Sequence, residues 1–233
     1  MNRYTDIDFT LKTLPAVDDF RSAPLVSLKE ALEPLACQIE QLSDYIQFAE
    51  KHCRYPSEHG LTRDQSASLY LYTMERDDNS LYRVLNLALQ SEDGEMLTGW
   101  LPYLKLFDSA LDKLPTVNNV VWRGVPIDIG YSFKGGDTIT WSTINSCSSS
   151  VGVIRKFLEN EVETTLFRIE VMHGKNVSGY TAYEKEDEVI LGIGSRLRVE
   201  TVELDTFRVS RIVHLVEIDD NDNNGPSDRS SKQ

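Results

Sequence analysis

The spacing of apolar residues predicts that the first half of the chain is helical. Apolar side chains recur there every three or four positions, which is the period of an amphipathic helix. Ser27 and Glu30 have the spacing of a capping box, in which two side chains satisfy backbone N–H groups at a helix start. Thr62 and Gln65 repeat that spacing before a second amphipathic segment. We therefore expect helix through nearly all of residues 26–115.

Beyond Pro115 the pattern changes to that of strands. Short runs rich in β-branched residues are separated by Gly, Asn or Asp, as in strands joined by turns. Residues 151–158 instead fit one short helix. A block of helices followed by a block of strands indicates an α+β protein, because a doubly wound α/β fold would alternate the two. The runs expected to form strands are residues 117–125, 138–141, 166–172, 188–191, 197–204 and 207–218.

These patterns divide the chain into four parts. We expect a polar lead-in at residues 1–25, poorly ordered, followed by the helical lobe at 26–115. A β core at 116–218 would carry the functional motifs. Residues 219–233 are rich in Asp, Asn and Ser without an apolar anchor, which predicts a disordered tail.

Composition narrows the classes of partner. The chain has 233 residues, enough for one sizeable domain or two small lobes that share a core. Acidic residues outnumber basic ones 37 to 24, which gives a net charge of −13 and a pI near 4.8. Such a surface repels phosphate groups, so we expect no nucleic acid and no anionic membrane as a partner. No segment reaches the ~18 apolar residues of a spanning helix.

The cysteines and the N-terminal segment indicate a compartment. Cys37, Cys53 and Cys147 are an odd set without metal-ligand spacing, so we interpret them as reduced thiols and expect no metal. The first 20 residues lack the apolar region of a secretory signal. The sequence therefore predicts a cytoplasmic protein.

An arginine interrupts the apolar run at residues 120–125. An unpaired buried guanidinium is costly, so Arg123 indicates a cleft for an anionic ligand, and its planar fork suits a pyrophosphate. Gly124 would let that ligand approach the backbone closely. The alternative is an edge strand with a solvated arginine.

Two serines follow at alternate positions. Ser146 and Ser148 would share one side of an extended strand, where small hydroxyls can orient carboxylates or a sugar. The alternative is a Ser-rich strand end that caps the helix starting near Val151. Cys147 would act as a nucleophile only beside a histidine, and the sequence shows no such pairing.

An acidic turn leads into the run at residues 188–191. If the segment is extended, Glu186 and Glu188 share a face. Paired carboxylates at a strand mouth suit glycosidic chemistry, in which one stabilises charge on the sugar and the other assists proton removal. Mutual repulsion and partial burial would raise at least one pKa. The alternative is a solvated acidic turn.

Taken in order, these motifs resemble the R-S-E pattern of arginine-specific mono-ADP-ribosyltransferases, in particular the eukaryotic ectoenzyme type. The resemblance covers residues 27–218. It implies a helical lobe packed on a two-sheet antiparallel β core, with NAD in a cleft between the sheets. Further similar segments lie at residues 60–62, 69–75, 80–86, 101–106, 177–180 and 214–218.

The resemblance also implies how NAD would be held. Arg123 would bind the phosphates and the nicotinamide ribose, and the Gly124 backbone would bind the carboxamide of nicotinamide. Ser146 would orient Glu188 by a hydrogen bond, and Ser148 would belong to the same NAD-binding strand. Glu188 would bind the ribose hydroxyl and stabilise the oxocarbenium as nicotinamide departs.

On the acceptor side, the resemblance implies that Glu186 engages the arginine guanidinium and that Tyr183 contacts it. Positioning and electrostatics suffice for this chemistry, so neither a metal nor a covalent nucleophile is required. The expected enzyme is an NAD(P)+–protein-arginine ADP-ribosyltransferase, a monomer that uses NAD as co-substrate and a protein with an exposed arginine as acceptor.

Two departures and two alternatives accompany this prediction. Cys147 stands where the family has the middle Thr of Ser-Thr-Ser, and the cysteines give no framework of paired disulfides. An NAD glycohydrolase would use the same cleft, but Glu186 argues against it. An inactive NAD- or protein-binding module would be expected to have lost Glu188, which is present.

Overall fold

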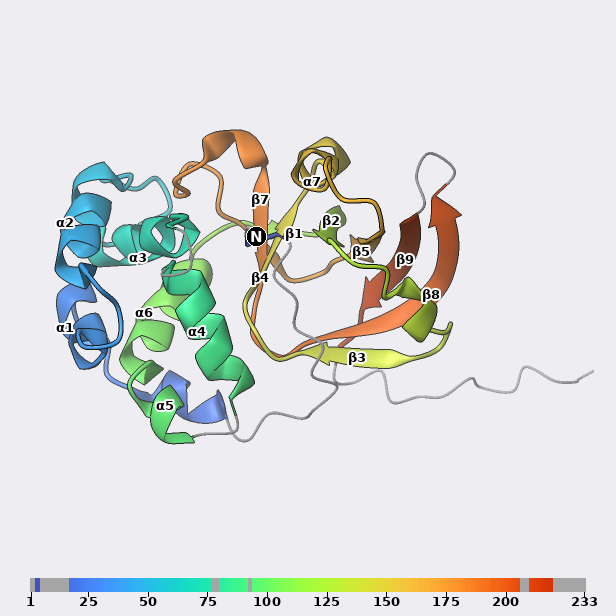
Figure 1. Cartoon of the computed structure of the whole chain (residues 1–233). Helices are drawn as coiled ribbons and strands as arrows, with labels where there is room; N and C mark the ends of the chain where they lie inside the picture. The colour runs from blue at the N-terminus through green and yellow to red at the C-terminus, as the bar shows by residue number, and fades with distance from the viewer. Residues whose placement is uncertain (1–2, 5–16, 77–79, 92–93, 206–209, 220–233) are drawn as a thin grey trace, which may run out of the picture.

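The computed structural model describes residues 3–4, 17–76, 80–91, 94–205 and 210–219 (Figure 1). Helices gather in one lobe and strands in the other, as the α+β prediction requires. Of the tail expected at residues 219–233, all but Asp219 lies outside the described residues.

The helical lobe follows the predicted pattern closely. Both capping boxes are present: Ser27 caps the first α-helix through Glu30, and Thr62 caps the third through Gln65. The elements of this lobe are η1 (Val17–Ser22), α1 (Leu28–Leu32), η2 (Glu33–Leu35), α2 (Leu42–His52), α3 (Arg63–Thr73), α4 (Leu81–Gln90), α5 (Gly94–Thr98) and α6 (Leu101–Leu111).

In the residues that the structure describes, the second lobe is a nine-stranded sheet with the order β1-β6-β7-β4-β2-β5-β9-β8-β3. One α-helix, α7 (Val151–Phe157), lies on it where the sequence predicts a short helix. Two short 3-10 turns, η3 (Gly130–Ser132) and η4 (Glu184–Glu186), connect strands. The strands are β1 (Thr116–Val117), β2 (Val120–Val125), β3 (Thr138–Trp141), β4 (Asn145–Ser148), β5 (Thr164–Glu170), β6 (Gly174–Asn176), β7 (Glu188–Leu191), β8 (Ser195–Asp205) and β9 (Ser210–Glu217).

The sheet corrects the prediction of two antiparallel sheets. Trp122 in β2 lies opposite Ser148 in β4, and this pairing joins the two halves into one sheet. In addition, β5 and β9 run parallel, whereas the other paired strands are antiparallel. Periodicity predicts where strands lie but not which strands pair, so this arrangement could not be predicted from the sequence.

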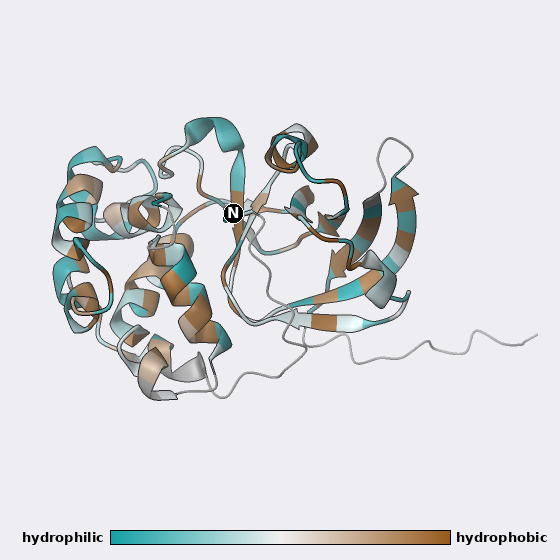
Figure 2. Cartoon of the chain, viewed as in Figure 1, coloured by the Kyte–Doolittle hydropathy of each residue, from teal (hydrophilic) through white to brown (hydrophobic). Residues whose placement is uncertain are grey.

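Apolar contacts join the two lobes. The core of the helical lobe includes side chains from the second lobe, among them Ile144, Val177, Tyr180 and Ile190. A second core lies within the sheet, and alternating apolar and polar residues along β8 and β9 mark its face (Figure 2). The helical lobe therefore packs directly beside β4 and β7, the strands that carry the serine and glutamate motifs.

None of the helices in the described ranges is both long enough and apolar enough to cross a membrane.

The packing around β6 yields a test of the sheet. A Cβ added at Gly174 would lie 2.8 Å from Val189 Cγ1 and 3.1 Å from Val171 Cγ2. Valine side chains are stiff at χ1, so Gly174→Ala should lower the free energy of unfolding by about 1–3 kcal/mol, measured by urea denaturation. Gly192→Ala is the control, because nothing lies within 4 Å of its added Cβ. Equal stability of the two variants would contradict this packing.

Candidate active site

Arg123 is buried in the middle of the sheet. It projects from β2, which lies between β4 and β5, and only 4% of its surface is exposed. Its Nη1 donates hydrogen bonds to the backbone carbonyls of Ser146 at 2.7 Å and Arg3 at 2.8 Å. The alternative of a solvated arginine on an edge strand is therefore wrong.

Gly124 is required by the helix that covers it. An added Cβ would lie 2.6 Å from Leu158 Cδ1 and 2.7 Å from Ile154 Cγ2, on or next to α7. The Gly124 N–H donates to the backbone carbonyl of Tyr4 at 3.4 Å. The backbone at Gly124 thus faces a chain segment from the N-terminal end of the protein.

The two serines of β4 are buried and have different environments. Ser148 lies opposite Glu188 of β7, and its Oγ donates to the backbone carbonyl of Glu186 at 2.7 Å. Ser146 lies opposite Ile190, and its buried Oγ makes no hydrogen bond to a carboxylate among the described residues.

The expected hydrogen bond from Ser146 to Glu188 is therefore not formed. Thr181 Oγ1 instead donates to Glu188 Oε2 at 3.1 Å. Thr181 was not predicted, because a threonine in an irregular loop carries no periodic or spacing signal.

The two glutamates reach the site by a turn rather than by strand alternation. Glu188 is the first residue of β7 and is 0% exposed. Glu186 belongs to η4, and Asp187 between them has a left-handed φ of 47°. The condition for a shared face, an extended segment, is therefore not met here. The carboxylates nevertheless converge on one partner.

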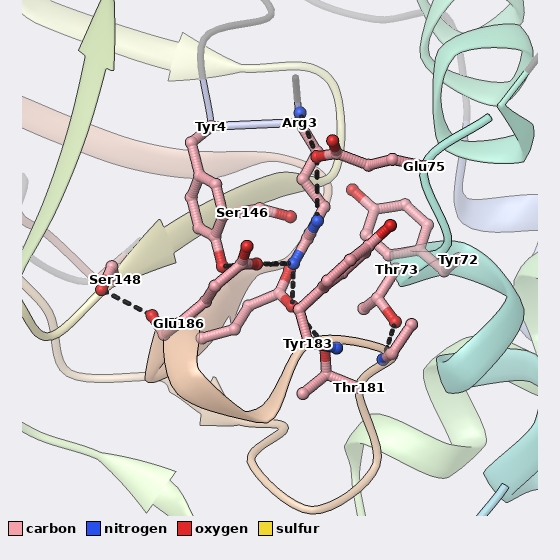
Figure 3. A network of polar contacts seen from close by, with 12 residues as sticks. Arg3, Tyr4, Tyr72, Thr73, Glu75, Ser146, Ser148, Thr181, Tyr183 and Glu186 are labelled. Atoms are coloured by element: carbon pink, nitrogen blue, oxygen red, sulfur yellow. Dashed lines mark hydrogen bonds and ion pairs between the residues drawn. The ribbon is translucent and has the colours of Figure 1, made fainter. Parts of the chain in front are cut away.

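That partner is the guanidinium of Arg3 (Figure 3). Its Nε donates to Glu188 Oε1 at 2.9 Å and its Nη2 to Glu188 Oε2 at 3.1 Å. Nη2 also bonds to Glu186 Oε2, and Nη1 donates to Glu75 Oε1 at 2.9 Å. The Arg3 side chain is 0% exposed, although it belongs to the stretch expected to be a polar lead-in.

Aromatic rings flank the guanidinium. The Tyr183 ring centre lies 5.1 Å from Arg3 Cζ, and Tyr183 is 39% exposed. The Tyr4 hydroxyl donates to Glu186 Oε2 at 3.2 Å, and the Tyr4 ring stacks on Phe157 of α7 with centroids 5.2 Å apart. Cation–π contact adds to the charge pairing, so the site suits a planar cation.

The helical lobe supplies part of the site. Glu75 lies just beyond the end of α3, and Thr73 Oγ1 accepts the backbone N–H of Ala182 at 2.8 Å. That bond ties the loop before Glu186 to α3 (Figure 3). Glu75 belongs to the family-like segment at residues 69–75, but no role was predicted for it.

Burial sets the protonation of these groups. Burial raises the pKa of Glu186 above its usual value, against the lowering effect of Arg3. Burial alone would lower the pKa of Arg3, but Glu188, Tyr4 and Glu186 together hold that pKa well above its usual value. Arg3 is therefore a full cation between carboxylates, and Glu186 is a better proton acceptor near neutral pH than an ordinary glutamate.

The remaining candidates for chemistry are metal-ligating side chains and the thiol of Cys147. In the described ranges, no group of three or more His, Cys, Asp or Glu is placed to hold a metal ion. Cys147 is fully buried, and burial raises the pKa of its thiol to about 12. A thiol in that state is not a nucleophile at neutral pH.

Comparison with known proteins gives this geometry a context. A family model described as NAD:arginine ADP-ribosyltransferase matches residues 22–222. A protein of Mycobacterium avium (strain 104), named as the NAD(+)--arginine ADP-ribosyltransferase Mav, is 29% identical over 163 residues. The match covers 68% of this chain but only 18% of the length of that relative.

Solved structures share the fold. ADP-ribosyltransferase Vis of Vibrio splendidus, in a complex with agmatine, has a TM-score of 0.57 at 17% identity, over 87% of this chain and 91% of that chain. ADP-ribosyltransferase HopU1 of Pseudomonas syringae pv. Tomato DC3000 has a TM-score of 0.58 at 16% identity, over 89% of this chain and 100% of that chain. The architecture is therefore that of ADP-ribosyltransferases.

The environment of Cys147 predicts its reactivity. In the folded protein at pH 8, iodoacetamide should label Cys37, which is exposed, and leave Cys147 unmodified, because a thiol with a pKa of about 12 is almost fully protonated there. Peptide mass spectrometry measures both sites, and unfolding in urea should make them equally reactive. Rapid labelling of Cys147 in the folded protein would contradict this assignment.

Proposed function

Because the chain belongs to the NAD:arginine ADP-ribosyltransferase family, we propose that it transfers ADP-ribose from NAD to arginine side chains of protein acceptors and releases nicotinamide. One observation carries the proposal. Glu186 and Glu188 together bind the guanidinium of an arginine, Arg3, which has the chemistry of the proposed acceptor. An arginine side chain therefore fits between these carboxylates.

The NAD side of the site would use donors that already point into it. Arg123 Nη1 and the Gly124 N–H both donate to carbonyl oxygens of the N-terminal segment. In the enzyme–substrate complex, Arg123 would bind NAD phosphate and ribose oxygens, and the Gly124 backbone would bind the nicotinamide carboxamide. Ser146 and Ser148, both buried on β4, would complete this side.

Glu188 would act on the bond that breaks. The C1′–N bond between ribose and nicotinamide cleaves with its electron pair going to nicotinamide, which leaves neutral. The ribose gains positive charge, and a buried carboxylate beside it stabilises that charge strongly because little water screens it. Thr181 would hold Glu188 in position through its 3.1 Å hydrogen bond.

Glu186 would act on the acceptor. A guanidinium nitrogen forms the new bond to C1′ and loses a proton, which Glu186 accepts. Its raised pKa suits that role. The bond from Ser148 Oγ to the Glu186 carbonyl fixes the turn, and the Tyr183 ring covers the guanidinium.

Glu75 would be a second carboxylate of the acceptor site, beside Glu186. It contacts the Nη1 of Arg3, the nitrogen that Glu186 and Glu188 leave free of hydrogen bonds to them. Two carboxylates from two lobes, Glu75 and Glu186, would then select a guanidinium over an ammonium, because only the planar fork reaches both of them.

Several expectations from the sequence accompany this proposal. They are the R-S-E class, the division into a helical lobe and a β core at residue 115, a monomeric state, a cytoplasmic location and a partner set without nucleic acid or membrane. The net charge of −13 supports the last of these.

Agmatine, a small guanidine, tests the proposed reaction. With NAD present, mass spectrometry should detect ADP-ribosyl-agmatine. Glu188→Gln should lower both nicotinamide release and adduct formation by ~100-fold or more, whereas Glu186→Gln should lower adduct formation by a similar factor and nicotinamide release much less. The different losses follow from the separate partners proposed for the two carboxylates.

Glu184→Gln is the matched control, because Glu184 belongs to the same turn and is exposed. It should retain wild-type activity. Free ADP-ribose without adduct would favour a glycohydrolase, and the absence of any NAD turnover would favour an inactive binding module.

The role of Glu75 has its own test. Glu75→Gln should raise the KM for agmatine by ~10-fold, since one charge-assisted hydrogen bond to the guanidinium is weakened. Nicotinamide release without acceptor should not fall. Glu58→Gln, an exposed carboxylate of the same lobe, is the control. An unchanged KM for agmatine would remove Glu75 from the acceptor site.

A further inference from the structure

We propose that Arg3 and Tyr4 form an intramolecular ligand of the active site that competes with NAD. This inference rests on the proposed function for the roles of Arg123, Gly124 and Glu188. It goes beyond that function because it assigns a regulatory contact to the N-terminal end of the chain.

The side chain of Arg3 fills the position of the NAD ribose. It bonds to both oxygens of Glu188, at 2.9 Å and 3.1 Å, and neither side chain has exposed surface. A ribose hydroxyl that binds Glu188 needs the same oxygens and the same space. Arg3 and NAD therefore cannot occupy Glu188 together.

The backbone of the dipeptide occupies the other proposed NAD contacts. The Arg3 carbonyl accepts from Arg123 Nη1 at 2.8 Å, and the Tyr4 carbonyl accepts from the Gly124 N–H at 3.4 Å. These oxygens lie where phosphate, ribose or carboxamide oxygens would be bound. Two consecutive residues thus satisfy three of the groups assigned to NAD, which are the Glu188 carboxylate, Arg123 Nη1 and the Gly124 N–H.

Tyr4 anchors the dipeptide. Its side chain is 0% exposed, it stacks on Phe157, and its hydroxyl donates to Glu186. A buried aromatic ring with a satisfied hydroxyl contributes apolar burial that Arg3 alone lacks. The dipeptide is therefore held by apolar packing and hydrogen bonds as well as by ion pairs.

The position of the guanidinium distinguishes a competitor from an acceptor. An acceptor would leave Glu188 to the ribose and approach Glu186 from beyond it. Arg3 instead places Nε and Nη2 on Glu188 itself, with Nη2 shared with Glu186. A guanidinium bonded directly to both Glu188 oxygens leaves no room for a ribose between Glu188 and the arginine, so Arg3 blocks the site without being a substrate.

Competition of this kind has a defined kinetic signature. The apparent affinity for NAD equals the intrinsic affinity multiplied by the fraction of molecules in which the site is open. Saturating NAD displaces Arg3 and Tyr4 from the site. If the segment is bound nine-tenths of the time, its removal should lower the KM for NAD by ~10-fold and leave kcat unchanged.

The experiment uses the full chain with NAD and saturating agmatine. Arg3→Ala should lower the KM for NAD by ~10-fold at constant kcat, and Arg3→Lys should lie between wild type and Arg3→Ala, because lysine keeps the charge but loses the fork. Arg21→Ala is the matched control, since the Arg21 side chain is 66% exposed on the helical lobe. An unchanged or higher KM for NAD in Arg3→Ala would overturn the proposal.

Equilibrium binding separates this proposal from the proposed function. NAD should raise the thermal unfolding temperature of Arg3→Ala more than that of the wild type, whether or not ADP-ribose is transferred. Tighter NAD binding without transfer would uphold the competition and refute the reaction. Failure of Arg3→Ala to bind NAD would overturn the competition, as would ADP-ribose on Arg3 of the wild type in peptide mass spectrometry.

Discussion

The burial of the Glu188 carboxylate is the constraint on which the site depends. A charge with no exposed surface is tolerated only when hydrogen bonds and opposite charge replace the water it has lost. Thr181 supplies a hydroxyl and Arg3 supplies two N–H donors and a positive charge. The demand of this one carboxylate explains why an arginine from the far end of the chain lies in the middle of the protein.

Several elements serve to keep that carboxylate and its neighbours in place. Glu188 opens β7 opposite Ser148 of β4, and Ser148 fixes the preceding turn through the Glu186 carbonyl. Arg123 holds the other side of β4 through the Ser146 carbonyl at 2.7 Å. The serine strand is thus braced by hydrogen bonds on both flanks.

The helical lobe contributes more than apolar packing. Tyr72 and Asn86 both donate to the Ile144 carbonyl, at 3.3 Å and 3.2 Å, and so anchor the chain before β4. Thr73 holds the loop at Ala182, and Glu75 meets the guanidinium. The active site is therefore shared between the lobes, although the arginine, serine and glutamate motifs predicted from the sequence all lie in the second one.

The features that the sequence predicted well are those that depend on residues close together in the chain. Capping boxes, helical stripes and β-branched runs depend on neighbouring residues, so the helices and most strands are where they were expected. The buried Arg123 was also predicted, because an arginine in an apolar run demands a partner. Pairing order was not predicted, since periodicity does not reveal that β5 and β9 run parallel or that β2 and β4 join.

The active site was predicted only in part, because a sequence pattern shows local features but not which distant residues meet. Glu186 and Glu188 were identified, but as members of one extended segment, because a left-handed Asp187 leaves no mark in the sequence. Thr181, Glu75 and Arg3 come from a loop, a helix end and the N-terminal stretch. Only the folded chain brings them within hydrogen-bond distance.

The junction between β2 and β4 has a mechanical consequence. β2 pairs with β5 along its whole length, but in the described chain it meets β4 through the single pair of Trp122 and Ser148. The sheet therefore consists of two leaves joined over a short stretch of strand pairing, with Arg123 on one leaf and Glu188 on the other. Substitutions at the joint can change the angle between the leaves, and with it the reach from phosphate to ribose, without shifting the register of any strand.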